Sequence, residues 1–337
     1  MSRIRTVIVM STVALISVFA TTQARAVPRT HVSAAVGADT NVAAGCTPVA
    51  PCRTFKAAMA KTDPNGEVVV LDSGGYDAVT IAQSVALIAP TGVYAGISVP
   101  AKANGVTIAT SGLNVVLRGI AINGQGGNNG IVMTADSKLT IENCVVANLG
   151  LHGIFVSGLA TVRITDTIVR DSGSEGVWIE NGARGTITRA TISGNAASGI
   201  YMQGHLGNTV TKVDIANSTF DGNAIGVVAF SDNASAVVNV SLRDSRVVRN
   251  QSVGLHSQSN AGATVSVSAS SNIVSNNVTG MLALGAGVKL WASGNTVSDN
   301  LNTGLVNAGG VFESAGDNAV RNNGLNKNGP ISVIPTE

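Results

Sequence analysis

The chain has 337 residues, of which 45% are hydrophobic, 12% charged and only 3% aromatic, and its formal net charge is +2. A surface this close to neutral gives no electrostatic basis for holding a polyphosphate backbone. The composition therefore excludes nucleic acid as an expected partner.

The first 26 residues have the pattern of an export signal. Arg3 and Arg5 precede an apolar run at residues 7–20, and the small-x-small pattern "ARA" ends at Ala26. The run is too short to span a bilayer, and no later run is long enough either. We expect a mature chain that begins at Val27, has 18 basic and 19 acidic residues, and is periplasmic or extracellular without a transmembrane segment.

The three cysteines divide into a pair and a single residue. Cys46 and Cys52 close the short segment "CTPVAPC", and in an oxidising compartment we expect them to form a disulfide. Cys144 lies in the apolar run "IENCVVANL", where a buried small residue is the expected role rather than a reactive thiol.

A repeat with spacings of 23 to 28 residues runs through the second half of the chain. Each unit reads aliphatic, two variable residues, Asn or Asp, a short gap, Gly and an aliphatic residue. The glycines are Gly153, Gly176, Gly199, Gly226, Gly254, Gly280 and Gly304. The Asn or Asp positions are Asn148, Asp171, Asn195, Asn223, Asn250, Asn276 and Asn300, and the aliphatic or aromatic positions three residues earlier are Val145, Ile168, Ile192, Phe220, Val247, Ile273 and Val297.

The composition of these units predicts an all-β fold. They are rich in β-branched and small residues and poor in straight-chain helix formers. The spacing of leucine-rich repeats is missing, and so are the aromatic girdles of a membrane barrel. We predict a parallel β-helix of about ten coils, with successive coils about 4.8 Å apart. The Asn column is then expected to take left-handed turn conformations and to pass amide hydrogen bonds along the stack.

The segment "CRTFKAAMAKTDPNGEVVVLDSGGYDAVTI", residues 52–81, resembles the beginning of pectate lyase-like right-handed β-helices. Its parts are a capping helix from about Thr54 to Lys61, a "PNG" turn, a first strand "EVVVL" and a Gly-Tyr turn. Together with the repeats it resembles exported bacterial right-handed β-helix proteins. The resemblance implies a right-handed single-stranded helix with an N-terminal cap, but the superfamily hosts many activities and so does not specify the chemistry.

The expected domain organisation has one elongated body. Residues 1–26 are the signal, 27–66 the N-terminal lead-in and cap, 67–324 the parallel β-helix, and 325–337 a C-terminal tail or cap.

Alternation along the strands predicts which side chains face outward. The first residue after each glycine is always aliphatic and is expected in the core: Ile154, Val177, Ile200, Val227, Leu255, Met281 and Leu305. The next residue then faces solvent. That outward column is Phe155, Trp178, Tyr201, Val228, His256, Leu282 and Val306.

Phe155, Trp178 and Tyr201 would therefore lie one above another on the surface. Exposed rings suit the apolar faces of sugars, and Gln203 and Glu180 could bind hydroxyl groups, which predicts a carbohydrate-binding strip. The alternative is an aromatic ladder that only stabilises the sheet.

A candidate catalytic group combines His152 and Glu175, each just before its glycine, with Glu180. Asp171 and Arg163 are close to them in sequence. The phrase "LHGI" around His152 faintly resembles the G-H-G motif of polygalacturonases, but the N-T-D, D-D and R-I-K motifs of that family are missing. The alternative for His152 is a solvated turn residue, and His205 and His256 have no partners at metal-ligand spacing, so no metal or other cofactor is expected.

Three functional hypotheses remain open. The first is an exported monomer that binds an extracellular or envelope polysaccharide without catalysis. The second is a polysaccharide lyase or related carbohydrate-active enzyme acting near His152, Glu175 and Glu180. The third is a structural or adhesive surface protein.

Overall fold

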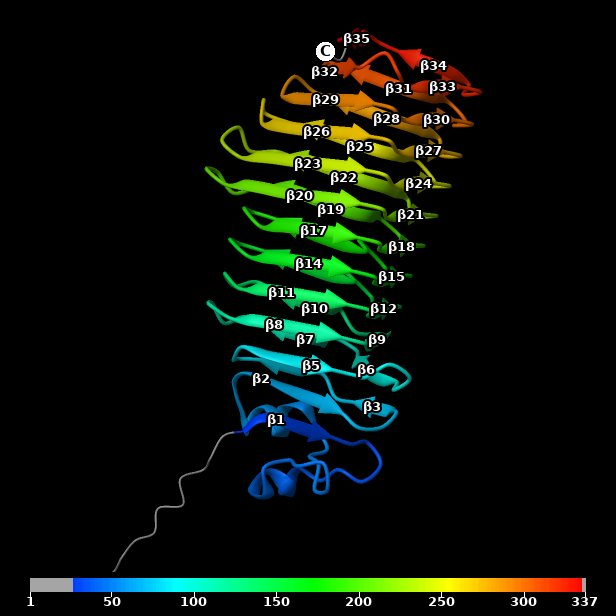
Figure 1. The fold of residues 1–337 in the computed structure, drawn as a ribbon. Helices are drawn as coiled ribbons and strands as arrows, with labels where there is room; N and C mark the ends of the chain where they lie inside the picture. The colour runs from blue at the N-terminus through cyan, green and yellow to red at the C-terminus, as the bar shows by residue number, and fades with distance from the viewer. Residues whose placement is uncertain (1–26, 335–337) are drawn as a thin grey trace, which may run out of the picture.

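A computed structural model describes residues 27–334, which form an elongated stack of coils (Figure 1). The expected export signal, residues 1–26, lies outside the described residues. Among residues 27–334 no helix has the length and apolar character needed to cross a membrane.

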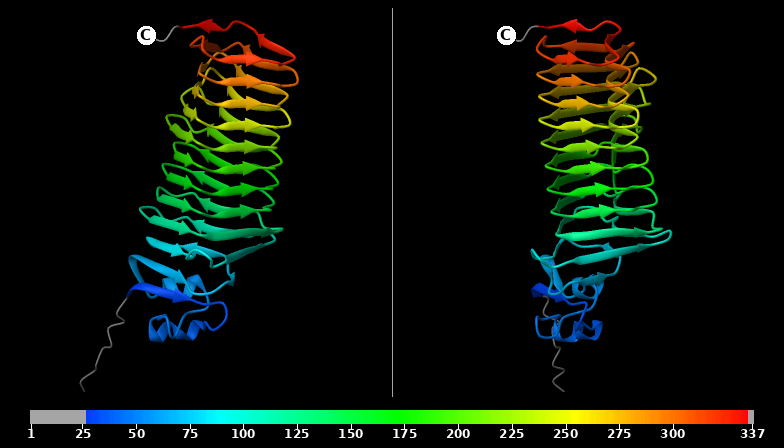
Figure 2. Two further views of the ribbon diagram at one scale, coloured as in Figure 1. Left: turned by 45° about the vertical axis from the view of Figure 1, so that its right-hand side comes forward. Right: turned by 90° about the vertical axis from the view of Figure 1, so that its right-hand side faces the viewer.

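Three parallel sheets make up the stack. Sheet 1 has 13 strands, and sheets 2 and 3 have 11 strands each, so the chain completes about eleven coils where the sequence predicts about ten. Each strand pairs with the equivalent strand of the next coil, as the side view in Figure 2 shows. The predicted parallel β-helix is confirmed.

The strands follow the repeat order sheet 1, sheet 3, sheet 2 in the regular coils. Sheet 1 contains β1 Val27–Val32, β2 Thr62–Val70, β5 Val85–Ile88, β8 Asn114–Arg118, β11 Lys138–Glu142, β14 Thr161–Thr165, β17 Arg184–Thr188, β20 Val210–Ala216, β23 Val237–Arg243, β26 Thr264–Ser270, β29 Val288–Ser293, β32 Val311–Ser314 and β35 Ser332–Val333. Sheet 2 contains β4 Val79–Ile81, β7 Asn104–Ile108, β10 Asn129–Met133, β13 Ile154–Ser157, β16 Val177–Glu180, β19 Ser198–Gly204, β22 Ile225–Ser231, β25 Val253–Ser259, β28 Thr279–Leu284, β31 Thr303–Ala308 and β34 Leu325–Asn328. Sheet 3 contains β3 Gly74–Tyr76, β6 Ala95–Pro100, β9 Ile120–Gln125, β12 Val145–Ala147, β15 Ile168–Arg170, β18 Thr191–Ser193, β21 Thr219–Asp221, β24 Arg246–Val248, β27 Ile273–Ser275, β30 Thr296–Ser298 and β33 Ala319–Arg321.

The core lies between sheets 1 and 2, whose inner faces pack on each other through pairs such as β22 with β26 and β19 with β23. In Figure 1 the strands of sheet 1 lie in front of those of sheet 2. The predicted inward column from Ile154 to Leu305 is buried throughout. The outer faces of the two sheets therefore look in opposite directions.

In three coils the aliphatic position of the repeat lies on the outward face of sheet 3, not in the core. Ile168 and Ile273 are 40% and 38% exposed, and Val145 pairs with Ile168 in the same outward column. The buried positions are the next residues along, such as Val169 and Val274. A slip of one residue moves a side chain to the opposite face, so β-branched residues at both positions hide the register.

The predicted Asn column is in fact two neighbouring columns. Asn148, Asp171 and Asn276 take left-handed backbone conformations, with φ values of 60°, 55° and 56°. The residue after each turn position points inward instead. There the buried side chains Asn195, Asn223, Asn250, Asn277 and Asn300 each donate an amide hydrogen bond to the next, and the series ends on the partly exposed Asn323. Asn276 is therefore a turn residue, and Asn277 takes its expected place in the ladder.

A short helix and a disulfide cap the N-terminal coil. Helix α1 spans Phe55–Met59 and is shorter than predicted, and the Thr54 hydroxyl caps it by accepting a hydrogen bond from the Ala57 amide at 3.1 Å. A 3₁₀ helix, η1, spans Asp39–Ala44. Cys46 and Cys52 form the expected disulfide.

The segment "PNG" does not separate the cap from the first strand as predicted. Asn65 has a φ of 67° within β2, and the pairing of β2 with β1 shifts between Val27 and Arg29. The segment is therefore an irregularity inside a longer strand. Elsewhere, Cys144 is buried as expected, and burial raises the pKa of its thiol to about 11.

Candidate functional site

Phe155, Trp178 and Tyr201 face outward from sheet 2, in register on the successive strands β13, β16 and β19. These three residues are named the aromatic strip. Their inward neighbours, among them Val177 and Ile179 on either side of Trp178, are fully buried, whereas the strip residues are partly exposed. The strip is therefore on the outside of the tube, as the alternation along the strands predicts.

The rings of the strip pack edge to face. The Phe155 and Trp178 ring centroids are 5.4 Å apart with planes at 76°, and those of Trp178 and Tyr201 are 5.5 Å apart with planes at 87°. Phe230 on β22 extends the series, 6.1 Å from Tyr201. Each such pair contributes about 0.5–1.5 kcal/mol beyond area burial. The strip thus stabilises sheet 2 whatever else it does.

The Trp178 indole is held on three sides. Besides its two neighbours in the strip, it meets the His152 imidazole edge to face at 4.9 Å. Its Nε1 atom is buried and has no hydrogen-bond partner among residues 27–334. The indole therefore offers only part of its surface to an outside partner.

His152 and Glu175 lie together, as the sequence predicts from their places in the repeat. His152 Nδ1 is 2.9 Å from Glu175 Oε2, without hydrogen-bond alignment, and both side chains are about 15% exposed (15% and 14%). The Ser174 hydroxyl donates to the same carboxylate at 2.6 Å. Burial raises the pKa of Glu175, but His152 and Ser174 outweigh it and the net pKa is lowered.

Glu180 belongs to a different column from this pair. It lies at the far end of β16 and accepts a hydrogen bond from Ser157 at 3.0 Å. Gln203 is its register partner on β19, and the Gln203 amide makes no side-chain hydrogen bond within the described chain. Burial raises the pKa of Tyr201, with further contributions from Glu175, Asp232 and Glu180. The strip is thus bordered by carboxylates.

The other members of the predicted cluster lie elsewhere. Arg163 points outward from β14 in sheet 1, on the opposite side of the tube, and Asp171 pairs with its neighbour Arg170 in an exposed turn. His205 pairs with Asp232 at 3.0 Å. Within residues 27–334 no group of three or more His, Cys, Asp or Glu side chains could hold a metal ion.

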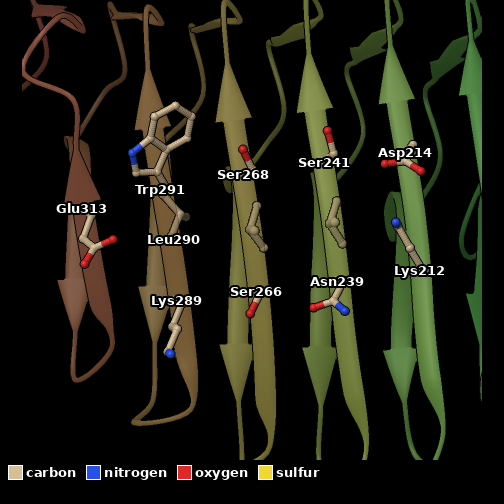
Figure 3. A pocket seen from close by; sticks show the side chains of 12 residues that line it. Lys212, Asp214, Asn239, Ser241, Ser266, Ser268, Lys289, Leu290, Trp291 and Glu313 are labelled. Atoms are coloured by element: carbon tan, nitrogen blue, oxygen red, sulfur yellow. The ribbon is translucent and has the colours of Figure 1, made fainter. Parts of the chain in front are cut away.

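Sequence reasoning missed a groove on the outer face of sheet 1 (Figure 3). Its volume is about 430 Å³, and it crosses strands β20, β23, β26, β29 and β32. The side chains that face it are Lys212, Asp214, Asn239, Ser241, Ser266, Ser268, Lys289, Trp291 and Glu313, and we name it the serine groove. Short side chains form its floor, and longer ones stand at both ends, as Figure 3 shows.

Trp291 was the signal that could have revealed the serine groove. It is one of only two tryptophans in the chain, and it alternates with the apolar Leu290 and Ala292 along β29. The glycine repeat anchors sheet 2, however, and does not fix the register of sheet 1.

Comparison with known proteins identifies the family of the fold. The family model for a right handed beta helix region matches residues 104–302, which is more than half of the chain. The chain belongs to this right-handed β-helix family. The match also confirms the hand that the sequence resemblance implies.

Solved structures resemble this β-helix protein along most of its length. Pectate lyase Pel9A is 17% identical with a TM-score of 0.61, over 88% of this chain and 79% of that chain. XylC in complex with xylose is 9% identical with a TM-score of 0.59, over 80% of this chain and 69% of that one. The Azotobacter vinelandii mannuronan C-5 epimerase AlgE6 A-module is 14% identical with a TM-score of 0.53, over 90% and 97%. At these identities the likeness establishes the fold alone, and no curated protein sequence matches the chain.

Proposed function

We propose that this β-helix protein is exported to the periplasm or the extracellular space and binds a polysaccharide there through the aromatic strip. The observation that carries the proposal is the register of Phe155, Trp178 and Tyr201, three aromatic side chains on outward positions of successive coils. The N-terminal export pattern and the Cys46–Cys52 disulfide support the location.

The strip has the length of a short glycan segment. Its three coils span about 10 Å at the usual strand spacing, which is enough for roughly two sugar units lying along the tube axis. The exposed parts of the rings offer apolar contacts to sugar C–H groups. The free Gln203 amide and the Tyr201 hydroxyl, which has no hydrogen-bond partner among the described residues, are available to sugar hydroxyls.

The charge around the strip favours an uncharged glycan. The charged groups that raise the pKa of Tyr201 are all carboxylates, namely Glu175, Asp232 and Glu180. A polyuronate brought against them would meet like charges, which costs free energy. We therefore expect neutral polysaccharides to bind the strip in preference to acidic ones.

A glycan array with matched variants tests this function. Trp178→Ala should weaken binding at least about tenfold, which corresponds to about 1.4 kcal/mol. Leu282→Ala is the control, because Leu282 occupies the same outward column on β28, away from the strip. Circular dichroism must show that both variants are folded. Binding that is unchanged in folded Trp178→Ala would contradict the proposal.

The His152–Glu175 contact supports a second candidate function, a carbohydrate-active enzyme of the lyase type. An imidazole 2.9 Å from a carboxylate is within reach for proton transfer. Unsaturated sugar ends absorb ultraviolet light, so their release from acidic glycans, and its loss in Glu175→Gln, would support this candidate. A wild-type protein that neither binds glycans nor releases such products would favour the structural or adhesive hypothesis instead.

A further inference from the structure

The polar side chains of the serine groove have no partners within the protein. None of its nine outward side chains makes a hydrogen bond or an ion pair within residues 27–334. The Trp291 indole N–H is also not buried, in contrast to that of Trp178. The groove therefore presents one aromatic ring together with donors and acceptors that are all free to bind a ligand.

The groove has a repeat that matches a chain of sugars. Lys212, Asn239, Ser266 and Lys289 form one row, each opposite the next across adjacent strands. A second row holds Asp214, Ser241, Ser268, Trp291 and Glu313. Three strand steps separate the outer members of the first row, about 14 Å, so roughly three sugar units would fit, with about one unit per strand step.

The charges of the groove cancel. Two ammonium groups, Lys212 and Lys289, stand in one row, and two carboxylates, Asp214 and Glu313, stand in the other. Sugar hydroxyls can donate to carboxylates and accept from ammonium groups. Because two positive and two negative groups balance, the groove has no net charge to attract a polyanion, which favours an uncharged ligand.

We infer that the serine groove binds a linear, uncharged oligosaccharide segment of about three sugar units, with one sugar against the Trp291 ring. This site lies on the face opposite the aromatic strip and does not depend on the function proposed for the strip.

Other occupants fit the groove less well. An extended peptide binds a sheet by pairing with a free edge, but β23 and β26 are paired on both sides. A second copy of the chain would need about 800 Å² of contact per partner, and a narrow groove across five strands does not by itself supply an interface of that size. The groove matches a narrow, polar, linear ligand.

The two tryptophans allow each site to be observed separately. In Trp178→Phe, the indole of Trp291 is the only one left, and its fluorescence reports on the groove. The folded Trp178→Phe protein is titrated with linear hexasaccharides of glucose, xylose and mannose, and with hexagalacturonate as the acidic comparison. We expect a saturable emission change with at least one neutral hexasaccharide and a much smaller one with hexagalacturonate.

A second variant, which fills the groove, tests whether the fluorescence response comes from binding there. Added to Trp178→Phe, Ser268→Leu should fill the floor and weaken the response at least about tenfold. Thr140→Leu is the matched control, because Thr140 occupies the same outward row on β11, outside the groove.

The outcomes separate this inference from the function of the strip. No emission change with any neutral hexasaccharide overturns the inference, and so does a response that Ser268→Leu leaves intact. Self-association that depends on Ser268, without a saccharide response, would assign the groove to a second copy and also overturn it. In the reciprocal variant Trp291→Phe, fluorescence reports only on Trp178. A saccharide-dependent emission change in Trp291→Phe but not in Trp178→Phe would support binding at the strip and contradict binding at the groove. A change in Trp178→Phe but not in Trp291→Phe would contradict binding at the strip alone.

Discussion

The aromatic strip and the serine groove occupy opposite faces of the same tube and use their polar groups differently. Beside the strip, His152 contacts Glu175 and Ser157 donates a hydrogen bond to Glu180, and within it the Trp178 N–H is buried. In the groove, the polar side chains are all unpaired within the described chain. An aromatic series is thus partly used to hold its own sheet together, whereas a single tryptophan beside short polar side chains leaves its surface to a partner.

The largest expected difference between the two faces is in stability. Trp178→Ala removes edge-to-face contacts with His152, Phe155 and Tyr201, and we expect it to lower the free energy of unfolding by about 3 kcal/mol. Trp291→Ala removes no aromatic contact among the described residues and should cost less than about 0.5 kcal/mol. Urea denaturation of both variants measures the difference. Equal losses would contradict the contrast between the faces.

A smaller effect is expected from the carboxylate of the strip. Glu175→Gln removes a carboxylate that His152 and Ser174 favour, and should cost about 1 kcal/mol at pH 7. Because the pKa of Glu175 in the folded protein is below its ordinary value of 4.5, its stabilisation is complete above that pH and is lost as the pH falls through the folded pKa.

The wild type and Glu175→Gln should therefore become equally stable at low pH. Denaturation midpoints measured between pH 7 and pH 3 would show this. Glu313→Gln, in the groove, is the control, because Glu313 has no partner within the described residues, and its midpoint should match the wild type. A difference in midpoint between wild type and Glu175→Gln that stays constant from pH 7 to pH 3 would contradict this role of the carboxylate.

The smallest effect should come from Tyr201→Phe. The Tyr201 hydroxyl bonds to nothing in residues 27–334, so its removal should change stability at pH 7 by less than about 0.5 kcal/mol. Burial and the nearby carboxylates raise the pKa of Tyr201, so its contribution is present below the ordinary value of 10.0 and declines at higher pH. Alkaline denaturation should therefore be slightly shallower in Tyr201→Phe, and identical pH profiles would argue against a buried phenol.

The glycine repeat predicts sheet 2 well because each glycine precedes the strand directly. Ile154 and its equivalents are buried, and Phe155, Trp178 and Tyr201 face outward, as alternation predicts, although Val228 in the same outward column is only 4% exposed. The register of sheet 3 is harder to predict from the sequence, because β-branched residues occupy both of its faces, as at Ile168 and Val169. A slip of one residue leaves this hydrophobic pattern unchanged.

The glycine repeat could not predict the serine groove. The segments between sheets 2 and 1 differ in length from coil to coil, as the spacings of 23 to 28 residues reflect. The residues of β23, β26 and β29 therefore cannot be aligned by counting from the glycines. Only strand pairing reveals that Ser241, Ser268 and Trp291 are neighbours. For the strip, the sequence predicts that the three rings lie one above another on the outer face, but it does not predict their edge-to-face packing.

The number of glycan segments that one chain binds tests the account most directly. Isothermal titration calorimetry of the wild-type protein with a neutral hexasaccharide should give two sites per chain. Trp178→Ala and Trp291→Ala should each leave one site, and the double variant none. A single site that survives both substitutions, or heat released only on adding an acidic glycan, would contradict binding on two opposite faces.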